Sequence, residues 1–354
     1  MFNIIDIMYD DAAKRGIPLG GTFELTPLCN MNCRMCYIRM TKSEMESHGK
    51  MRTAAEWLKL AEDAKKQGML FLLLTGGEPF LYPEFDELYE ELKKMGFFIS
   101  INSNGTLLEG ERLERLIKNP PYRINITLYG GSDEIYAELC GHDKGFSAAS
   151  HAIKELKKAG VYVKLNGSLT PFNASDISKC FDFAKETDVP IEIGTYMFPP
   201  MRRDDKSFSR LSAQEAGKYS VMIDRMRYDD KTFSDRTESM NECLSVGSKT
   251  DMPTKFRCRA GRSSFWINWK GEMTPCGMLE HFKEHPFENG FEESWKRIKE
   301  NIENCTVLSG CASCDKRDVC RVCPAIAYSE TGSFNKKPLY LCEYTDSRIK
   351  EFLK

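Results

Sequence analysis

The chain has 354 residues, of which 41% are hydrophobic and 29% charged, and its formal net charge is −2. This length is sufficient for one large core and a smaller second unit. With a near-neutral charge, the chain lacks the strong positive charge of a nucleic-acid-binding protein. It has no run of about 18 apolar residues, so no membrane span is expected. The N-terminal segment mixes acidic with apolar residues and has no basic region, so it does not predict a secretory signal.

Short apolar runs bounded by Gly, Pro or Asn predict six buried strands, at residues 22–26, 69–75, 97–102, 123–129, 161–169 and 190–196. Amphipathic stretches between them predict helices, for example at 53–67, 83–95, 147–159 and 174–187. Thr53 followed by Glu56 is a capping-box signature. Glycines stand where three helices should end, at Gly68, Gly96 and Gly160.

Alternation of strands and helices predicts parallel strands with right-handed crossovers. The fold class is therefore α/β, a partial (β/α)6 barrel like a TIM barrel but incomplete. In such barrels the chemistry gathers at the C-terminal ends of the strands. We expect an N-terminal extension at 1–20, the barrel at 21–200, a charged helical linker at 201–257, and a small cysteine-rich domain organised around metal at 258–354.

Fourteen cysteines are the outstanding feature of the composition. Without a signal peptide, metal ligation explains them better than disulfides do, and a reducing, cytoplasmic location follows. Three of them form C-x3-C-x2-C just beyond the first predicted strand, at Cys29, Cys33 and Cys36. A 4Fe–4S cluster normally takes four thiolates, so three would leave one iron open. The alternative is a structural zinc site, which needs four closed ligands.

Glycines and polar residues follow the next two strands. The second strand ends in TGGEP at 75–79, where two glycines would let backbone approach a ligand and Glu78 or the carbonyls could hold an ammonium group. The third ends in NSNG at 102–105, whose side chains could bind ribose hydroxyls. Taken singly, each segment is more simply an ordinary turn.

Together, the cysteine loop and these strand ends resemble the radical S-adenosylmethionine (SAM) superfamily over about residues 20–200. The resemblance implies a 4Fe–4S cluster whose open iron is chelated by SAM. It also implies reductive cleavage of SAM to methionine and a 5′-deoxyadenosyl radical, which abstracts hydrogen from the substrate. By the same resemblance, the expected SAM contacts are Tyr37 beside the adenine, with Gly76, Gly77, Glu78, Pro79, Asn102, Ser103 and Asn104.

The chain departs from the family after the fourth strand. Many relatives carry an arginine there that reaches the SAM carboxylate, whereas this chain has Cys140 at about that place. Thr127, Asn166 and Ser168 are the substitute SAM contacts that we expect. Cys140 is also a candidate hydrogen-atom donor, although a free cysteine commonly packs as a small apolar residue, as we expect for Cys180 and Cys305.

Seven spaced cysteines form a second group near the C-terminus, with Gly271 between the first two of them. These cysteines could instead be ligands of one or two zinc ions. The pattern instead resembles the SPASM domain, which carries two auxiliary 4Fe–4S clusters. The resemblance implies an outer cluster on Cys311, Cys314, Cys320 and Cys342, and an inner cluster on Cys258, Cys276 and Cys323. The inner set is one thiolate short, so either Cys243 joins it or one iron stays open.

SPASM relatives mostly modify peptides, so we expect a radical SAM oxidoreductase that oxidises a peptide or protein by crosslinking, thioether formation, epimerisation or dehydrogenation. The implied cofactors are SAM and three 4Fe–4S clusters. The implied partners are a reductant such as flavodoxin or ferredoxin and, since the barrel begins near residue 22, either a separate leader-binding protein or a short substrate without a leader. Alternatives are a small-molecule dehydrogenase, a sulfatase-maturase-like enzyme, and a zinc-stapled interaction protein with no SAM chemistry.

Overall fold

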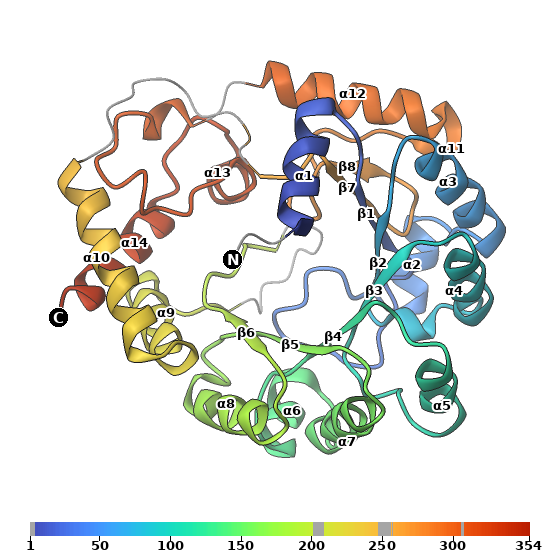
Figure 1. The fold of residues 1–354 in the computed structure, drawn as a ribbon, viewed down its shortest axis with the longest axis horizontal. Helices are drawn as coiled ribbons and strands as arrows, with labels where there is room; N and C mark the ends of the chain where they lie inside the picture. Colours follow the sequence, from blue (N-terminus) through green and yellow to red (C-terminus); the bar gives the residue numbers. More distant parts are fainter. Residues whose placement is uncertain (1–3, 201–208, 247–255, 257, 306–307) are drawn as a thin grey trace.

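The computed structural model describes residues 4–200, 209–246, 256, 258–305 and 308–354. All six predicted strands are present and pair in sequence order as parallel neighbours. They are β1 (Gly20–Glu24), β2 (Phe71–Thr75), β3 (Phe98–Ser103), β4 (Arg123–Thr127), β5 (Val163–Ser168) and β6 (Ile191–Gly194). The sheet curves with its helices outside it (Figure 1), which confirms the partial (β/α)6 barrel.

The helices that cover the outer face of the sheet are mostly where the amphipathic pattern predicts them. They are α2 (Lys42–His48), α3 (Ala54–Lys66), α4 (Phe85–Lys94), α5 (Gly110–Lys118), α6 (Asp133–Cys140), α7 (Gly145–Lys158) and α8 (Ile177–Glu186). The capping box predicted before α3 is present, with Thr53 and Glu56 satisfying each other's backbone donors. Gly68, Gly96 and Gly160 follow α3, α4 and α7 with φ of 102°, 84° and 77°.

The cysteine-rich region adds two strands that the sequence did not predict. Strand β7 (Ser264–Ile267) pairs in parallel with β1, and β8 (Met273–Thr274) folds back antiparallel to β7. The β7–β8 turn needs Gly271, which has φ +90° and no room for a Cβ beside Phe287 and Arg52. The barrel sheet therefore continues into the C-terminal region instead of stopping at β1.

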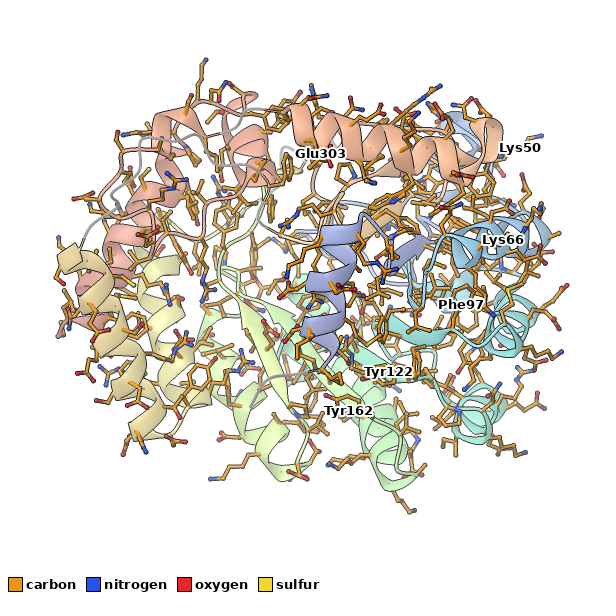
Figure 2. The ribbon with its side chains drawn as sticks, turned by 45° about the horizontal axis from the view of Figure 1, so that its top comes forward. Lys50, Lys66, Phe97, Tyr122, Tyr162 and Glu303 are labelled. Atoms are coloured by element: carbon orange, nitrogen blue, oxygen red, sulfur yellow. The ribbon has the colours of Figure 1, made fainter. Side chains whose placement is uncertain are left out.

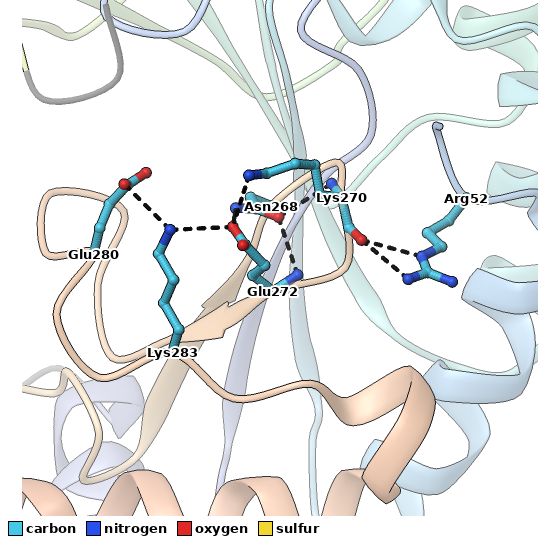
Figure 3. Close-up of polar contacts among 6 residues, drawn as sticks. All are labelled: Arg52, Asn268, Lys270, Glu272, Glu280 and Lys283. Atoms are coloured by element: carbon cyan, nitrogen blue, oxygen red, sulfur yellow. Dashed lines mark hydrogen bonds and ion pairs between the residues drawn. The ribbon is translucent and has the colours of Figure 1, made fainter. Parts of the chain in front are cut away.

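A polar network fixes this turn against the barrel (Figure 3). The Asn268 side chain accepts from the Glu272 N–H at 3.0 Å and donates to its carboxylate at 2.7 Å. The Arg52 guanidinium, just before α3, donates to the Lys270 carbonyl through Nε at 3.2 Å and a terminal nitrogen at 3.1 Å. Lys283 pairs with Glu272 at 3.4 Å. These contacts join segments far apart in the sequence at one edge of the sheet.

Helix α1 (Ile4–Arg15) lies at the end of the barrel where the strands begin. Figure 2 shows it on the same side as Phe97, Tyr122 and Tyr162, which immediately precede β3, β4 and β5. The Tyr9 ring stacks on Phe71 with centroids 5.7 Å apart. The helix therefore covers the N-terminal strand ends and leaves the C-terminal ends for the site.

Helices from the linker and the C-terminus lie beyond β6. They are α9 (Ala213–Arg227), α10 (Asp230–Val246), α13 (Pro324–Thr331) and α14 (Leu339–Phe352), while α11 (Pro286–Asn289) and α12 (Phe291–Asn304) lie near α3. Helices α9 and α14 pack closely because Gly217 has no side chain, and a Cβ there would meet the Tyr344 carbonyl at 2.6 Å. Among the described helices, none is both long and apolar enough to cross a membrane.

Candidate functional site

A cavity of about 290 Å³ opens at the C-terminal ends of the strands. Most of the residues predicted at the site line it: Cys29, Cys33, Cys36, Tyr37, Gly76, Gly77, Asn102, Ser103, Asn104, Thr127 and Ser168. Glu78, Pro79 and Asn166 are not among its lining residues. The described side chains that line it include no Asp, Glu, Lys, Arg or His. Most of the predicted site residues therefore meet at one cavity, whose described lining contains none of these charged residue types.

The three N-terminal cysteines lie on the loop between β1 and α2, with donors directed at two of their sulfurs. The Met31 N–H lies 3.4 Å from Cys29 Sγ, and the Arg39 N–H lies 3.2 Å from Cys36 Sγ. The Asn104 amide also reaches Cys29 Sγ at 3.7 Å. Burial raises the pKa of the Cys29 thiol to about 12. Such donors stabilise negative sulfur, while burial opposes a free thiolate, so the loop fits iron bound in place of the thiol protons.

The Gly76-Gly77 pair lies directly against the segment that leads into the cysteine loop. Gly77 N–H donates to the Thr26 carbonyl at 2.7 Å, and Glu78 N–H donates to the Leu28 carbonyl at 2.8 Å. A Cβ on Gly77 would lie 2.4 Å from the Leu28 oxygen. Glycine is therefore required for close packing between two backbones, in addition to any contact with a ligand.

Glu78 connects the ends of β2 and β3. Its carboxylate is fully buried and accepts from Ser103 Oγ at 2.9 Å, from the Asn104 N–H at 2.8 Å and from the Phe80 N–H at 3.2 Å. Burial raises the pKa of Glu78 to about 7, although these hydrogen bonds act to lower it. In this arrangement Glu78 holds two predicted SAM contacts in place, and direct contact between its side chain and SAM stays a prediction.

A second network supports the same strand ends through Asn30 and Thr106, which the sequence gave no reason to select. Asn104 Nδ2 donates to Asn30 Oδ1 at 2.9 Å, and Asn104 Oδ1 accepts from the Thr106 N–H at 2.9 Å and its hydroxyl at 2.7 Å. Asn30 donates in turn to the Thr106 hydroxyl at 2.8 Å. The cysteine loop is thus bonded to the end of β3.

The far wall of the cavity comes from the segment after β6, at Tyr196, Met197 and Phe198. An ion pair holds this wall, because Arg210 binds both oxygens of Glu330 on α13 at 2.6 and 2.9 Å and donates to the Met197 carbonyl at 3.0 Å. Tyr196 donates to the same Glu330 carboxylate at 2.6 Å. Residues of the cysteine-rich region therefore position part of the cavity.

The C-terminal cysteines fall into the two predicted groups. Burial, followed by the nearby thiols of Cys342, Cys320 and Cys314, raises the pKa of Cys311. Burial raises the pKa of Cys323 to about 11, with further contributions from Cys258 and Cys276. In each group at least one sulfur accepts a hydrogen bond, from Thr345 Oγ1 to Cys320 at 3.4 Å, from Met278 N–H to Cys276 at 3.4 Å, and from Ile326 N–H to Cys323 at 3.5 Å.

Cys243 lines a surface cavity together with Cys320, Arg321 and Arg348, whereas Cys258 and Cys276 line a different cavity. Within the described ranges, no three His, Cys, Asp or Glu side chains converge as they would around a single metal ion. Ligation of clusters by the C-terminal cysteines, and any part of Cys243 in the inner set, stay predictions.

The model of the radical SAM superfamily matches residues 23–184, which contain the cysteine loop and the ends of β2 to β5. Residues 23–184 therefore form a radical SAM domain. The resemblance seen in the sequence is thereby confirmed for the barrel, and it is joined to a cysteine-rich C-terminal region.

Several known proteins are similar to this chain over most of its length. An AdoMet-dependent heme synthase of Methanosarcina barkeri is 25% identical over 339 residues, which cover 91% of this chain and 95% of that protein. The subtilosin biosynthesis protein AlbA of Bacillus subtilis is 27% identical over 80% of this chain and 59% of its own length. The crystal structure of anSMEcpe with bound AdoMet has a TM-score of 0.70 at 18% identity, covering 95% of this chain and 97% of that one.

Proposed function

We propose that this radical SAM enzyme oxidatively modifies a peptide side chain. The observation that carries the proposal is the composition of the cavity, whose described lining is apolar or neutral and polar. One lining residue, Met278, is two positions from Cys276 and also lines the cavity that contains Cys258 and Cys276. A substrate side chain at Met278 would thus lie between the predicted SAM cluster and the predicted inner auxiliary cluster.

Bound SAM with a reduced 4Fe–4S cluster supplies a 5′-deoxyadenosyl radical that removes a hydrogen atom from the substrate. The chain's own residues position and enclose the reactants. Cys29, Cys33 and Cys36 would hold the cluster, and Gly76, Gly77 and the ends of β3 to β5 would surround SAM. Tyr196, Met197 and Phe198 would exclude water from the substrate side. The C-terminal cysteines would hold two further clusters, which would supply an electron acceptor for the two-electron oxidation of the substrate.

Relatives support a peptide substrate. AlbA is a biosynthesis protein for the bacteriocin subtilosin, and anSMEcpe has also been solved with AdoMet and a peptide, Kp18Cys. A reductant belongs to the same proposal, because an external electron must enter the SAM cluster, and so does any separate leader-binding protein.

The second candidate is a reaction on a tetrapyrrole, because the heme synthase match extends over nearly the whole of both proteins. Tetrapyrrole precursors of haem carry several carboxylates, and burying them requires cationic partners. The described lining of the cavity offers none. The peptide is placed first because the names of two similar proteins, AlbA and anSMEcpe with the Kp18Cys peptide, refer to peptides.

The test compares the two substrate classes on anaerobically reconstituted enzyme with SAM and dithionite. One set of assays uses synthetic peptides whose sequences are encoded by short open reading frames next to the gene. The other set uses an iron porphyrin with propionate groups. We expect 5′-deoxyadenosine to form together with a peptide that has lost two hydrogens by mass spectrometry. Modification of the porphyrin with no change in any peptide would overturn the peptide proposal while leaving the radical chemistry intact.

A further inference from the structure

A second cavity, of about 520 Å³, lies between the end of β6 and the helices beyond it. Figure 1 shows these helices, α9, α10 and α14, along the side of the barrel that β6 borders. Tyr196 lines this cavity and also lines the cavity at the C-terminal strand ends. The two cavities are therefore neighbours that share one side chain in their walls.

Three arginines from separate elements line the second cavity, which we call the arginine cavity. They are Arg227 on α9, Arg236 on α10 and Arg321 in the segment before α13. Arg227 and Arg321 are exposed, so solvent reaches this cavity. Among the described ion pairs, only Arg236 of the three takes part, with Asp224 at 3.4 Å, and its buried Nε has no hydrogen-bond partner there. The described residues therefore leave much of the hydrogen-bonding capacity of these guanidinium groups unused.

Asp224, on α9, is one of two carboxylates in the described lining of the arginine cavity. It is 8% exposed and pairs both with Arg236 and with Arg348 on α14, the latter at 3.5 Å. Arg348 is 7% exposed, and its Nε has no hydrogen-bond partner in the described part of the chain. Because each guanidinium has five N–H donors, one carboxylate cannot satisfy both arginines.

Glu192, on β6, is the other carboxylate, and a lysine outside the cavity already binds it. Lys164 Nζ lies 2.5 Å from a Glu192 carboxylate oxygen. This hydrogen bond, followed by the charges of Lys164, Arg227 and Arg321, holds the pKa of Glu192 below its usual range. Within the described residues, five cationic side chains thus share two carboxylates at this cavity. Since partly buried cations are stabilised by anionic partners, the cavity favours a further carboxylate.

We propose that the arginine cavity binds a carboxylate of the substrate whose reacting group lies at the C-terminal strand ends. An arginine binds a carboxylate through two parallel hydrogen bonds, and arginines from three elements surround the space. The same chemistry is available in an acidic side chain of a peptide and in a propionate of a tetrapyrrole. The inference rests on the proposed radical chemistry for the position of the reacting group, but not on which of these two substrates is correct.

The test measures binding to the iron-loaded enzyme by isothermal titration calorimetry. The probes are a capped peptide with two glutamates, its counterpart with two glutamines, an iron porphyrin with propionate groups, and the same porphyrin with its propionates converted to amides. Arg227→Gln and Arg236→Gln each remove one guanidinium from the arginine cavity. Arg225→Gln is the matched control, because Arg225 is an exposed arginine on the same helix as Arg227 and does not line the cavity.

We expect each cavity variant to bind a carboxylate probe about tenfold more weakly than the native enzyme, and Arg225→Gln to bind it with native affinity. Binding of the glutamate peptide but not its glutamine counterpart assigns the site to an acidic peptide. Binding of the propionate porphyrin alone, without its amide form or either peptide, supports the carboxylate site and overturns only the peptide as substrate.

Three results overturn the carboxylate site. The first is no binding of either carboxylate probe, or equal binding of the carboxylate and amide forms. The second is native affinity in both cavity variants. The third is loss of iron from both cavity variants while Arg225→Gln stays fully loaded, because the arginines would then serve a cluster and not the substrate. Failure of the native enzyme to form 5′-deoxyadenosine with SAM and dithionite would instead contradict the radical chemistry.

Discussion

Replacing Gly77 by alanine should disturb the SAM-cluster loop through a backbone collision. The added Cβ would lie 2.4 Å from the Leu28 oxygen and 2.7 Å from the Pro27 oxygen. Such contacts are essentially never shorter than 3.0 Å, so the two backbones must separate by roughly 0.6 Å in an interior with little free space. Leu28 immediately precedes Cys29, and the displacement passes directly into the predicted cluster loop.

Catalysis is sensitive to displacements of this size, because a misplacement of about 1 Å can cost about 10²-fold in rate. We therefore expect Gly77→Ala to form 5′-deoxyadenosine about tenfold more slowly than the native enzyme. The assay follows 5′-deoxyadenosine by chromatography in anaerobic enzyme with SAM and dithionite. Rates are expressed per bound iron, so that loss of cluster and loss of rate are counted separately.

Gly194→Ala provides the matched control for this substitution. Gly194 ends β6, and a Cβ there would have the Gly167 oxygen, 3.9 Å away, as its nearest neighbour. This variant should keep the native rate and iron content. If Gly77→Ala also kept both, close packing of the two backbones would not position the cluster loop, and the reasoning would fail.

Three further outcomes follow from the described contacts. Glu330→Ala leaves Arg210 without its partner, whose side chain is 8% exposed, and should lower the free energy of unfolding by about 3 kcal/mol. The measurement is a lower melting temperature than in a variant of the exposed pair Lys354–Glu351. Cys243→Ala should retain native iron per chain, whereas Cys320→Ala should lose one cluster's iron; equal losses would contradict the separation of Cys243 from the ligand sets. Because burial raises the pKa of Glu78 from 4.5 to about 7, its stabilising contribution in the metal-free protein is full below pH 4.5 and is lost as the pH rises through 7. Glu78→Gln should remove that part of the pH dependence of the melting temperature, and a native-like slope between pH 5 and about 7 would contradict the prediction.

The barrel and the place of its site were predictable because both depend on local patterns. Apolar runs identified all six barrel strands, and Thr53, Glu56 and Gly68 identified the bounds of α3. Parallel strands bring their C-terminal ends together, so residues after β1, β2 and β3 were expected to meet before any contact was known. Most of the predicted SAM contacts do line one cavity.

Contacts made across long stretches of sequence were not predictable. Strand β7 has four residues, too short for a period of two to be distinguished from a loop. Met278 lines the cavity only because the β7–β8 hairpin extends the sheet beside β1. The position of Cys243 on α10, in a cavity that it shares with Cys320, could not be inferred from its place in the sequence. Each of these outcomes depends on tertiary packing.

The pairing of β7 with β1 has a consequence for synthesis of the chain. Gly20 finds its partner Ser264 only after β2 to β6 and helices α9 and α10 have been translated. Until then β1 is an edge strand with unpaired amide and carbonyl groups, which can recruit strands of other chains. A nascent or truncated chain that stops before β7 is therefore expected to aggregate, and a shortened barrel prepared for biochemistry would need β7 supplied to the exposed side of β1.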